Sequence, residues 1–98
     1  MIPLSPGTRE RVEILFERED VTTVTRMLEE EVTQYPRDAT PQGLERLRFA
    51  VLRGSEGDLD RFLDLVRLAQ VDWRDALVGG GFGDDPTAHT NWWPDPPG

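Results

Sequence analysis

Residues 58–82 form the most apolar long segment of the chain, and their pattern predicts two consecutive helices. Apolar residues recur at spacings of three or four, so they line one face of a helix and leave charged residues on the other. Asp72 is a candidate N-cap for the second helix. The glycines at 79–81 end that helix, because glycine has low helix propensity and readily takes the left-handed cap conformation. The two apolar faces comprise Leu59, Phe62, Leu63, Val66 and Ala69, then Trp73, Ala76 and Leu77.

The N-terminal part of the chain predicts a short first helix. Two prolines and a glycine within residues 1–7 predict an irregular lead-in, and Thr8 is a candidate N-cap for a helix over residues 9–16. Charged residues of this helix, including Arg11, are expected on its outside. Its apolar face comprises Val12, Leu15 and Phe16.

A second helix is predicted from Asp20, a candidate N-cap, to about Gln34, after a turn near residues 17–19. The β-branched residues at 21–25 weaken helix propensity by a few tenths of a kcal/mol each, so a strand there is the alternative. We favour the helix because the apolar positions of residues 26–32 continue the same three- and four-residue spacing.

A third helix is predicted from Pro41 to about Arg53. Thr40 and Pro41 form an N-cap followed by a proline at the first helical position, and Gly54 is expected to end the helix. The connection over residues 55–57 is short, which favours antiparallel packing of the flanking helices as a hairpin. We therefore expect an all-α fold, a small up-and-down bundle of four to five short helices in which the earlier pair folds against this hairpin.

The chain is expected to divide into a helical domain over residues 1–83 and an aromatic, proline-rich tail over residues 84–98. Asp85 and the proline after it permit a single helical turn, whereas residues 94–98 must be extended. Trp92, Trp93 and Pro94 have two interpretations. They can fold back and cap the bundle, which we favour, or they can dock on a partner, since tryptophan is enriched at interface hot spots.

Composition narrows the functional classes. The chain has 98 residues, no cysteine and a formal charge of −8, and all of its eleven basic residues are arginine. One domain is expected, and disulfides and thiolate metal sites are excluded. We see no signal peptide and no apolar run long enough for a membrane span, so a cytoplasmic protein is expected. The acidic charge argues against nucleic-acid binding and is compatible with a basic protein partner.

Four blocks stand out in the middle and at the end of the chain. They are EEE at 29–31, ATPQGLERLRFAVL at 39–52, SEGDLD at 55–60 and DWRDALVGGGFGDDPTAH at 72–89. Together these blocks resemble a small uncharacterised bacterial family of short helical proteins, and the last block is the most specific. The resemblance implies a helical fold and no particular activity.

Two groups of residues in the predicted helices are candidates for partner binding. Glu29, Glu30 and Glu31 lie near a helix C-terminus, where carboxylates oppose the helix dipole, and they form either a solvated face or a docking patch for a basic partner. Trp73 lies in the first turn of a helix, which favours core packing over a ligand platform. Arg74 is expected to be exposed and able to pair with an aspartate such as Asp84.

His89 is the only histidine and hence the only candidate for acid–base chemistry near neutral pH. With Asp84 and Asp85 it could bind a divalent metal or position a water molecule. However, Asp85 already has a capping role and Asp84 is typical of a turn, so we favour a surface histidine. The sequence contains no nucleophile elbow, no HExxH zinc motif, no Walker loop and no dinucleotide-binding fingerprint.

We therefore expect a non-catalytic, acidic accessory or adaptor protein that binds another protein. No catalytic residue, metal ligand or cofactor is assigned. One alternative is a small metal-dependent or acid–base enzyme centred on His89 with Asp84 and Asp85, and another is an antitoxin, immunity protein or nucleic-acid mimic. The expected partner-binding residues are Glu29, Glu30, Glu31, Trp73, Arg74, His89, Trp92, Trp93 and Pro94.

Overall fold

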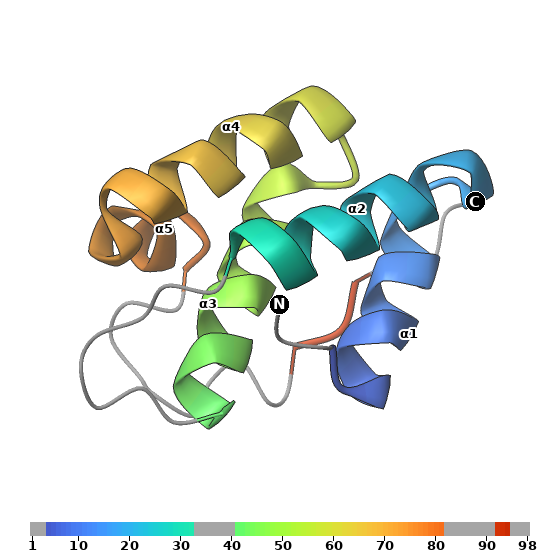
Figure 1. Cartoon of the computed structure of the whole chain (residues 1–98), viewed down its shortest axis with the longest axis horizontal. Helices are drawn as coiled ribbons and strands as arrows, with labels where there is room; N and C mark the ends of the chain where they lie inside the picture. The colour runs from blue at the N-terminus through green and yellow to red at the C-terminus, as the bar shows by residue number, and fades with distance from the viewer. Residues whose placement is uncertain (1–3, 33–40, 82–91, 95–98) are drawn as a thin grey trace.

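The computed structural model describes residues 4–32, 41–81 and 92–94, and within these ranges it contains five helices and no strand (Figure 1). This confirms the all-α fold. None of the described helices is long and apolar enough to cross a membrane. The helices are α1 (Pro6–Leu15), α2 (Arg18–Glu31), α3 (Pro41–Ser55), α4 (Leu59–Val71) and α5 (Trp73–Gly79).

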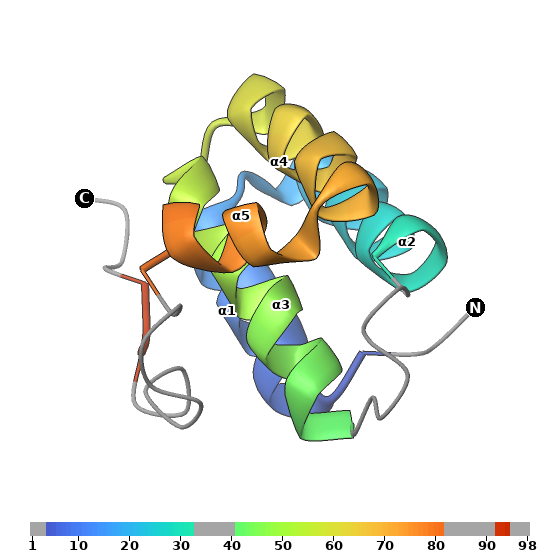
Figure 2. The same cartoon turned by 90° about the vertical axis from the view of Figure 1, so that its left-hand side faces the viewer.

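The first four helices form two helical hairpins that stack side by side. Figure 1 shows α1 beside α3 and α2 beside α4, with each pair running in the same direction, and Figure 2 shows the same arrangement from the side. The fifth helix packs on both helices of the second hairpin. The predicted α3–α4 hairpin, with the earlier pair folded against it, is therefore confirmed.

The hydrophobic core lies where the two hairpins meet. Phe16 of the first hairpin and Phe62 of the second make an edge-to-face contact, with ring centroids 5.6 Å apart. The interhelical core is therefore continuous between the hairpins. Its fully buried large side chains include Val12, Val24, Leu28, Leu47, Phe49, Val51, Leu52 and Phe62.

The start of α1 differs from the prediction. The helix begins at Pro6, and the N-cap is Ser5, whose Oγ accepts a hydrogen bond from the backbone N–H of Thr8 at 3.3 Å. Thr8, the expected cap, lies inside the helix and is 1% exposed. Ser5 and Pro6 repeat the N-cap and proline pattern from which the start of α3 was predicted, so the signal was present in the sequence.

The second helix is shifted by about three residues toward the N-terminus relative to the prediction. It begins at Arg18 after Glu17, whose side chain makes no capping hydrogen bond, and Asp20 lies in the first turn, where its charge complements the helix dipole. The helix ends at Glu31, three residues before the expected end. The alternative of a strand at residues 21–25 is wrong, because these residues lie within the helix.

Gly54 does not end α3, contrary to the prediction. The helix continues to Ser55, and the chain turns at Glu56 and Gly57, which have φ angles of 53° and 80°. A Cβ atom on Gly54 would lie 2.9 Å from Leu65 Cδ1. The glycine therefore allows α3 and α4 to approach closely inside the hairpin.

The predicted boundaries of α5 are confirmed. Asp72 is its N-cap, with Oδ1 accepting hydrogen bonds from the backbone N–H groups of Arg74 at 3.1 Å and Asp75 at 3.5 Å. The helix ends at Gly79, and Gly81 has a φ angle of 83°, the left-handed conformation expected for this glycine run.

Candidate functional site

The C-terminal tail returns to the bundle and contacts α1 and α3. The Nε–H of Arg11 donates a hydrogen bond to the carbonyl of Trp92 at 2.9 Å. The Arg11 guanidinium also lies over the rings of Trp93 and Phe49, with Cζ 3.5 Å and 4.3 Å from the two centroids. The Trp92 ring lies 6.0 Å from the Phe49 ring, and Pro94 is buried.

We call Arg11, Phe49 and Gly7, the bundle residues of this contact, the tail-binding site. Gly7 belongs to it because its carbonyl accepts a hydrogen bond from Arg11 Nη1 at 2.9 Å. A Cβ atom on Gly7 would lie 3.1 Å from that nitrogen. The glycine in the first turn of α1 therefore leaves room for the guanidinium.

Arg11 is 4% exposed, which contradicts its expected position outside the helix. Burial lowers the pKa of its guanidinium, and the nearby carboxylates of Glu45 and Glu10 oppose that shift. The sequence contained a signal for this, because Arg11 follows Thr8 by three residues and precedes Leu15 by four. Helical spacing alone thus places it with the inward-facing residues.

Arg48 is a second buried arginine that sequence reasoning missed. It is 3% exposed, and its Nε–H donates a hydrogen bond to the carbonyl of Val32 at 3.2 Å, at the C-terminal end of α2. Burial lowers its pKa, and the carboxylates of Glu29 and Glu45 oppose the shift. A cation at a helix C-terminus complements the helix dipole, so Arg48 joins α3 to the end of α2.

The three consecutive glutamates divide between internal contacts and solvent. Glu29 Oε2 accepts a hydrogen bond from the backbone N–H of Leu4 at 3.2 Å, and it lies 3.8 Å from Arg9 Nη2. Glu31 Oε2 accepts one from Gln70 Nε2 at 2.7 Å. Glu30 is exposed. The first and third glutamates therefore connect α2 to the lead-in segment and to α4.

Trp73 and Arg74 lie at the start of α5. The Trp73 side chain is half-buried and packs against the core, while Arg74 is exposed with Cζ 5.3 Å from the Trp73 ring centroid. Both line a hollow of about 330 Å³ together with Arg46, Leu77 and Val78. The tryptophan is thus neither fully in the core nor fully presented to solvent.

A shallow groove follows the outer side of the first hairpin, and we call it the α1–α2 groove. It consists of two adjoining hollows of about 310 and 450 Å³, which share Glu13, Val21 and Thr22 as lining residues. The short side chains of Thr22 and Thr25 replace the longer residues usual on an exposed helix face. The β-branched stretch that weakened the helix prediction therefore lines a surface groove.

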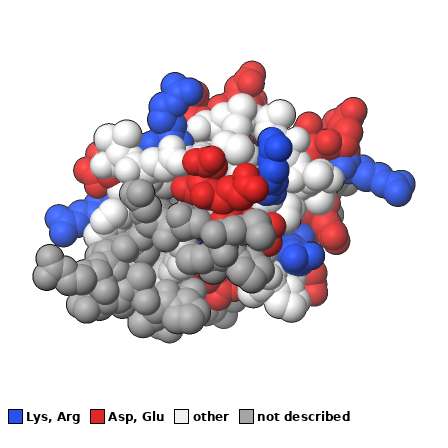
Figure 3. Space-filling view, in the orientation of Figure 1, with Lys and Arg blue, Asp and Glu red and all other residues white. Residues whose placement is uncertain are grey.

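Formal charge is unequal between the two hairpins. Residues 4–32 carry eight carboxylates and four arginines, a charge of −4, whereas residues 41–71 carry five of each. Each hairpin buries one of these arginines, Arg11 in the first and Arg48 in the second, so the difference of four charges between the two surfaces remains. Figure 3 shows carboxylates gathered over α2 on the face that is viewed there.

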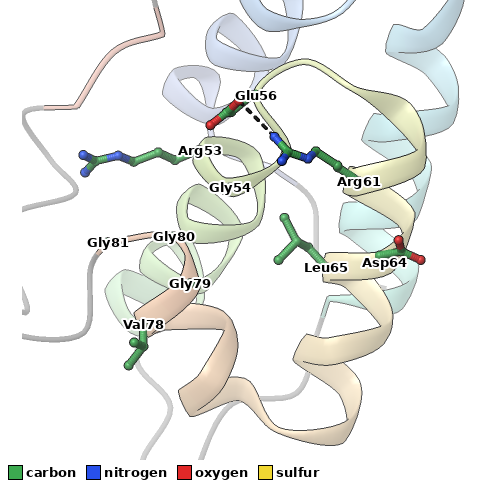
Figure 4. Close-up of a pocket in the computed structure, with 10 residues that line it drawn as sticks. All are labelled: Arg53, Gly54, Glu56, Arg61, Asp64, Leu65, Val78, Gly79, Gly80 and Gly81. Carbon is green, nitrogen blue, oxygen red and sulfur yellow. Dashed lines mark hydrogen bonds and ion pairs between the residues drawn. The ribbon is translucent and has the colours of Figure 1, made fainter.

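A further hollow, of about 530 Å³, lies between the C-terminal end of α3, α4 and the end of α5 (Figure 4). Its charged rim includes Glu56 and Arg61, which form an exposed ion pair at 2.9 Å, and Asp64. Gly80 closes one side, because a Cβ atom there would lie 2.4 Å from the carbonyl oxygen of Ala50. Its described lining residues include no histidine, cysteine or serine, and of its glycines Gly54 and Gly80 serve close helix packing.

The described residues contain no group of three or more histidine, cysteine, aspartate or glutamate side chains placed to hold a metal ion. His89, Asp84 and Asp85 lie outside the described residues, as does the candidate pairing of Arg74 with Asp84. The chain matches no protein-family model, no curated protein and no solved structure in the comparisons made.

Proposed function

We propose that this protein is a non-catalytic binding protein that docks a basic segment of another protein on its first hairpin. The observation that carries the proposal is the coincidence of the α1–α2 groove with the acidic hairpin. A groove gives a partner a shape to fit, and surrounding carboxylates steer a basic partner toward it. The near-neutral second hairpin offers no comparable attraction.

The groove lining suits a segment with mixed character. Val21, Thr22 and Thr25 are its uncharged lining residues, and charged side chains of both signs complete the lining. The charged lining residues are Glu13, Glu29, Arg9, Arg18 and Arg26. Glu10 precedes the lining residue Glu13 by three positions, Glu30 follows the lining residue Arg26 by four, and both glutamates are exposed. A partner with an apolar or hydroxyl-bearing strip flanked by lysine or arginine would match this arrangement.

The test compares two sets of charge-removing substitutions in the full-length tagged protein. Glu10→Gln, Glu13→Gln and Glu30→Gln alter the acidic hairpin, and Asp60→Asn, Asp64→Asn and Asp75→Asn are the matched control with the same change in net charge. We expect capture of a partner from the host to fall at least about tenfold, or about 1.4 kcal/mol, with the first set only. Added salt should weaken capture by the unsubstituted protein. Equal effects of the two sets, or none, would refute the proposal.

The alternative enzyme centred on His89 rests on residues outside the described part of the chain, and no structural observation favours it. The tail is also a poor target for a simple truncation test. Because residues 92–94 pack on the bundle, their removal would expose the bundle residues that they cover as well as remove any docking element.

A further inference from the structure

The tail-binding site is built by the helical bundle alone. Arg11 comes from α1 and Phe49 from α3, and Phe49 is 2% exposed. The Arg11 guanidinium is fixed from the bundle side, because its Nη1 donates to the carbonyl of Gly7 at 2.9 Å. The planar group therefore presents its Nε–H and one face in a direction that α1 sets, and the tail is not required to orient it.

The bound tail segment, residues 92–94, shows what ligand chemistry the site accepts. A main-chain carbonyl accepts the Arg11 Nε–H, and one aromatic ring stacks on the guanidinium while its neighbour contacts Phe49. The following proline is buried and restricts the backbone to an extended form. Recognition of an extended, proline-containing segment by aromatic side chains is a recurring mode of peptide binding.

We propose that the tail-binding site recognises an extended segment of another protein that carries two adjacent aromatic residues followed by proline. The chain's own residues 92–94 occupy the site as an intramolecular competitor. Trp93 remains 48% exposed, so its ring can leave the guanidinium without opening the core. The site shares no residue with the α1–α2 groove, and the two proposals can fail separately.

Competition by the chain's own tail should give the variants of this protein different affinities for a free peptide. A tethered segment acts at an effective concentration on the order of millimolar. A free peptide can therefore bind only to the fraction of molecules whose tail has left the site, and its apparent affinity falls by that fraction. The full-length Trp92→Ala/Trp93→Ala variant should leave the site open. Replacement of Arg11 by lysine keeps the charge but removes the planar stacking group and the Nε–H.

The experiment measures fluorescence anisotropy of a dye-labelled peptide, NWWPDPPG, which is the sequence of residues 91–98. We expect saturable binding to the double variant, binding at least about tenfold weaker to the unsubstituted chain, and a further loss of about tenfold when Arg11→Lys is added to the double variant. The control peptide NAAPDPPG should not bind. Absence of saturable binding to a double variant that keeps its helical circular dichroism would overturn the proposal, as would an unchanged affinity with Arg11→Lys.

If the double variant does not fold, the unsubstituted protein labelled with ¹⁵N provides the decisive measurement. Excess unlabelled peptide should move the indole N–H signals of Trp92 and Trp93 toward their positions in the free peptide. Signals that stay in place at millimolar peptide would contradict an exchangeable tail. Dimerisation that increases with concentration and requires both tryptophans would also overturn the assignment, because the occupant would then be the tail of a second copy.

Discussion

The two hairpins have the same architecture but are held in place by different interactions. Buried apolar side chains dominate the second hairpin, where residues 49–52 are all buried and α4 adds Phe62, Val66 and Ala69. The first hairpin buries a smaller apolar set and the polar Thr8 and Arg11, and the second hairpin likewise buries the polar Arg48 and Ser55. The buried apolar residues of the first hairpin include Val12, Phe16, Val24, Leu28 and Val32.

Polar contacts supply what the first hairpin lacks in apolar surface. Glu29 holds the backbone of Leu4, Ser5 Oγ donates to Glu45 Oε1 at 2.9 Å, and Arg11 connects α1 to the tail. Such contacts are directional and each adds little net stability, whereas apolar burial is non-directional and additive with area. The comparison indicates that the second hairpin provides stability and that the first provides a polar surface whose geometry is set by individual side chains.

The largest effect is expected from Phe62→Ala in the second hairpin. Phe62 is fully buried and contacts Phe16 across the two hairpins, so its loss should lower the free energy of unfolding by about 3 to 5 kcal/mol. Urea denaturation followed by circular dichroism measures this value. Leu63→Ala is the control, because its side chain is 37% exposed and its loss should cost less than about 1 kcal/mol. Similar losses for both would show that the burial of Phe62 between the two hairpins is not a main source of stability.

A smaller change in the free energy of unfolding is expected from substitutions where α5 packs on the second hairpin. Gly80→Ala would place a methyl group against the backbone of Ala50, and we expect a loss of about 2 to 3 kcal/mol as α5 shifts. Gly79→Ala meets no atom within 4 Å and lies in the helix, so it should be neutral or stabilise by up to about 1 kcal/mol. The thermal midpoints of the two variants should therefore move in opposite directions. A Gly80→Ala protein as stable as Gly79→Ala would contradict the close packing of α5 on α3.

In the first hairpin, Arg11→Lys should lower the free energy of unfolding by about 1 to 2 kcal/mol. The lysine retains a positive charge but cannot make the Nε–H bond to Trp92 or stack between two rings. The fluorescence emission of the tail tryptophans should shift to longer wavelength as they become exposed. Arg67→Lys, at an exposed position of α4, is the matched control and should change neither quantity. An Arg11→Lys protein with unchanged tryptophan emission would show that the tail is held by other contacts.

How far the sequence predicts the structure also differs between the hairpins. Where apolar spacing is dense, as in α3 and α4, it correctly predicted the helices, their pairing and the packing of the earlier pair against them. The prediction for Gly54 was wrong because a glycine near a helix end can either end the helix or allow another helix to pack closely. Only the position of Leu65 shows that close packing is its role here. That contact joins residues in different helices, and periodicity along one helix contains no information about it.

The candidate site was less predictable for a related reason. Trp92, Trp93 and Pro94 stood out by composition, and their folding back on the bundle was the favoured interpretation, which the structure confirms. Their partner Arg11 was expected outside the helix because a charged residue is usually exposed. Its burial depends on a tail residue that is 81 positions distant, and local sequence rules do not report such a contact.

The smallest predicted effects concern the helix caps at the starts of α2 and α4. Asp58 caps α4 of the second hairpin through a hydrogen bond from the backbone N–H of Arg61 at 3.1 Å, whereas Glu17 leaves the start of α2 without a side-chain cap. Asp58→Ala should therefore cost about 1 kcal/mol, and Glu17→Asp should add up to about 1 kcal/mol by supplying a shorter carboxylate that can reach the backbone N–H groups of the first turn. Both substitutions act at exposed helix starts, so chemical denaturation should show opposite shifts in the midpoint without a change in slope. If Glu17→Asp gave no gain, the start of α2 would already be satisfied by water, and the weakness of the first hairpin would lie in its apolar face alone.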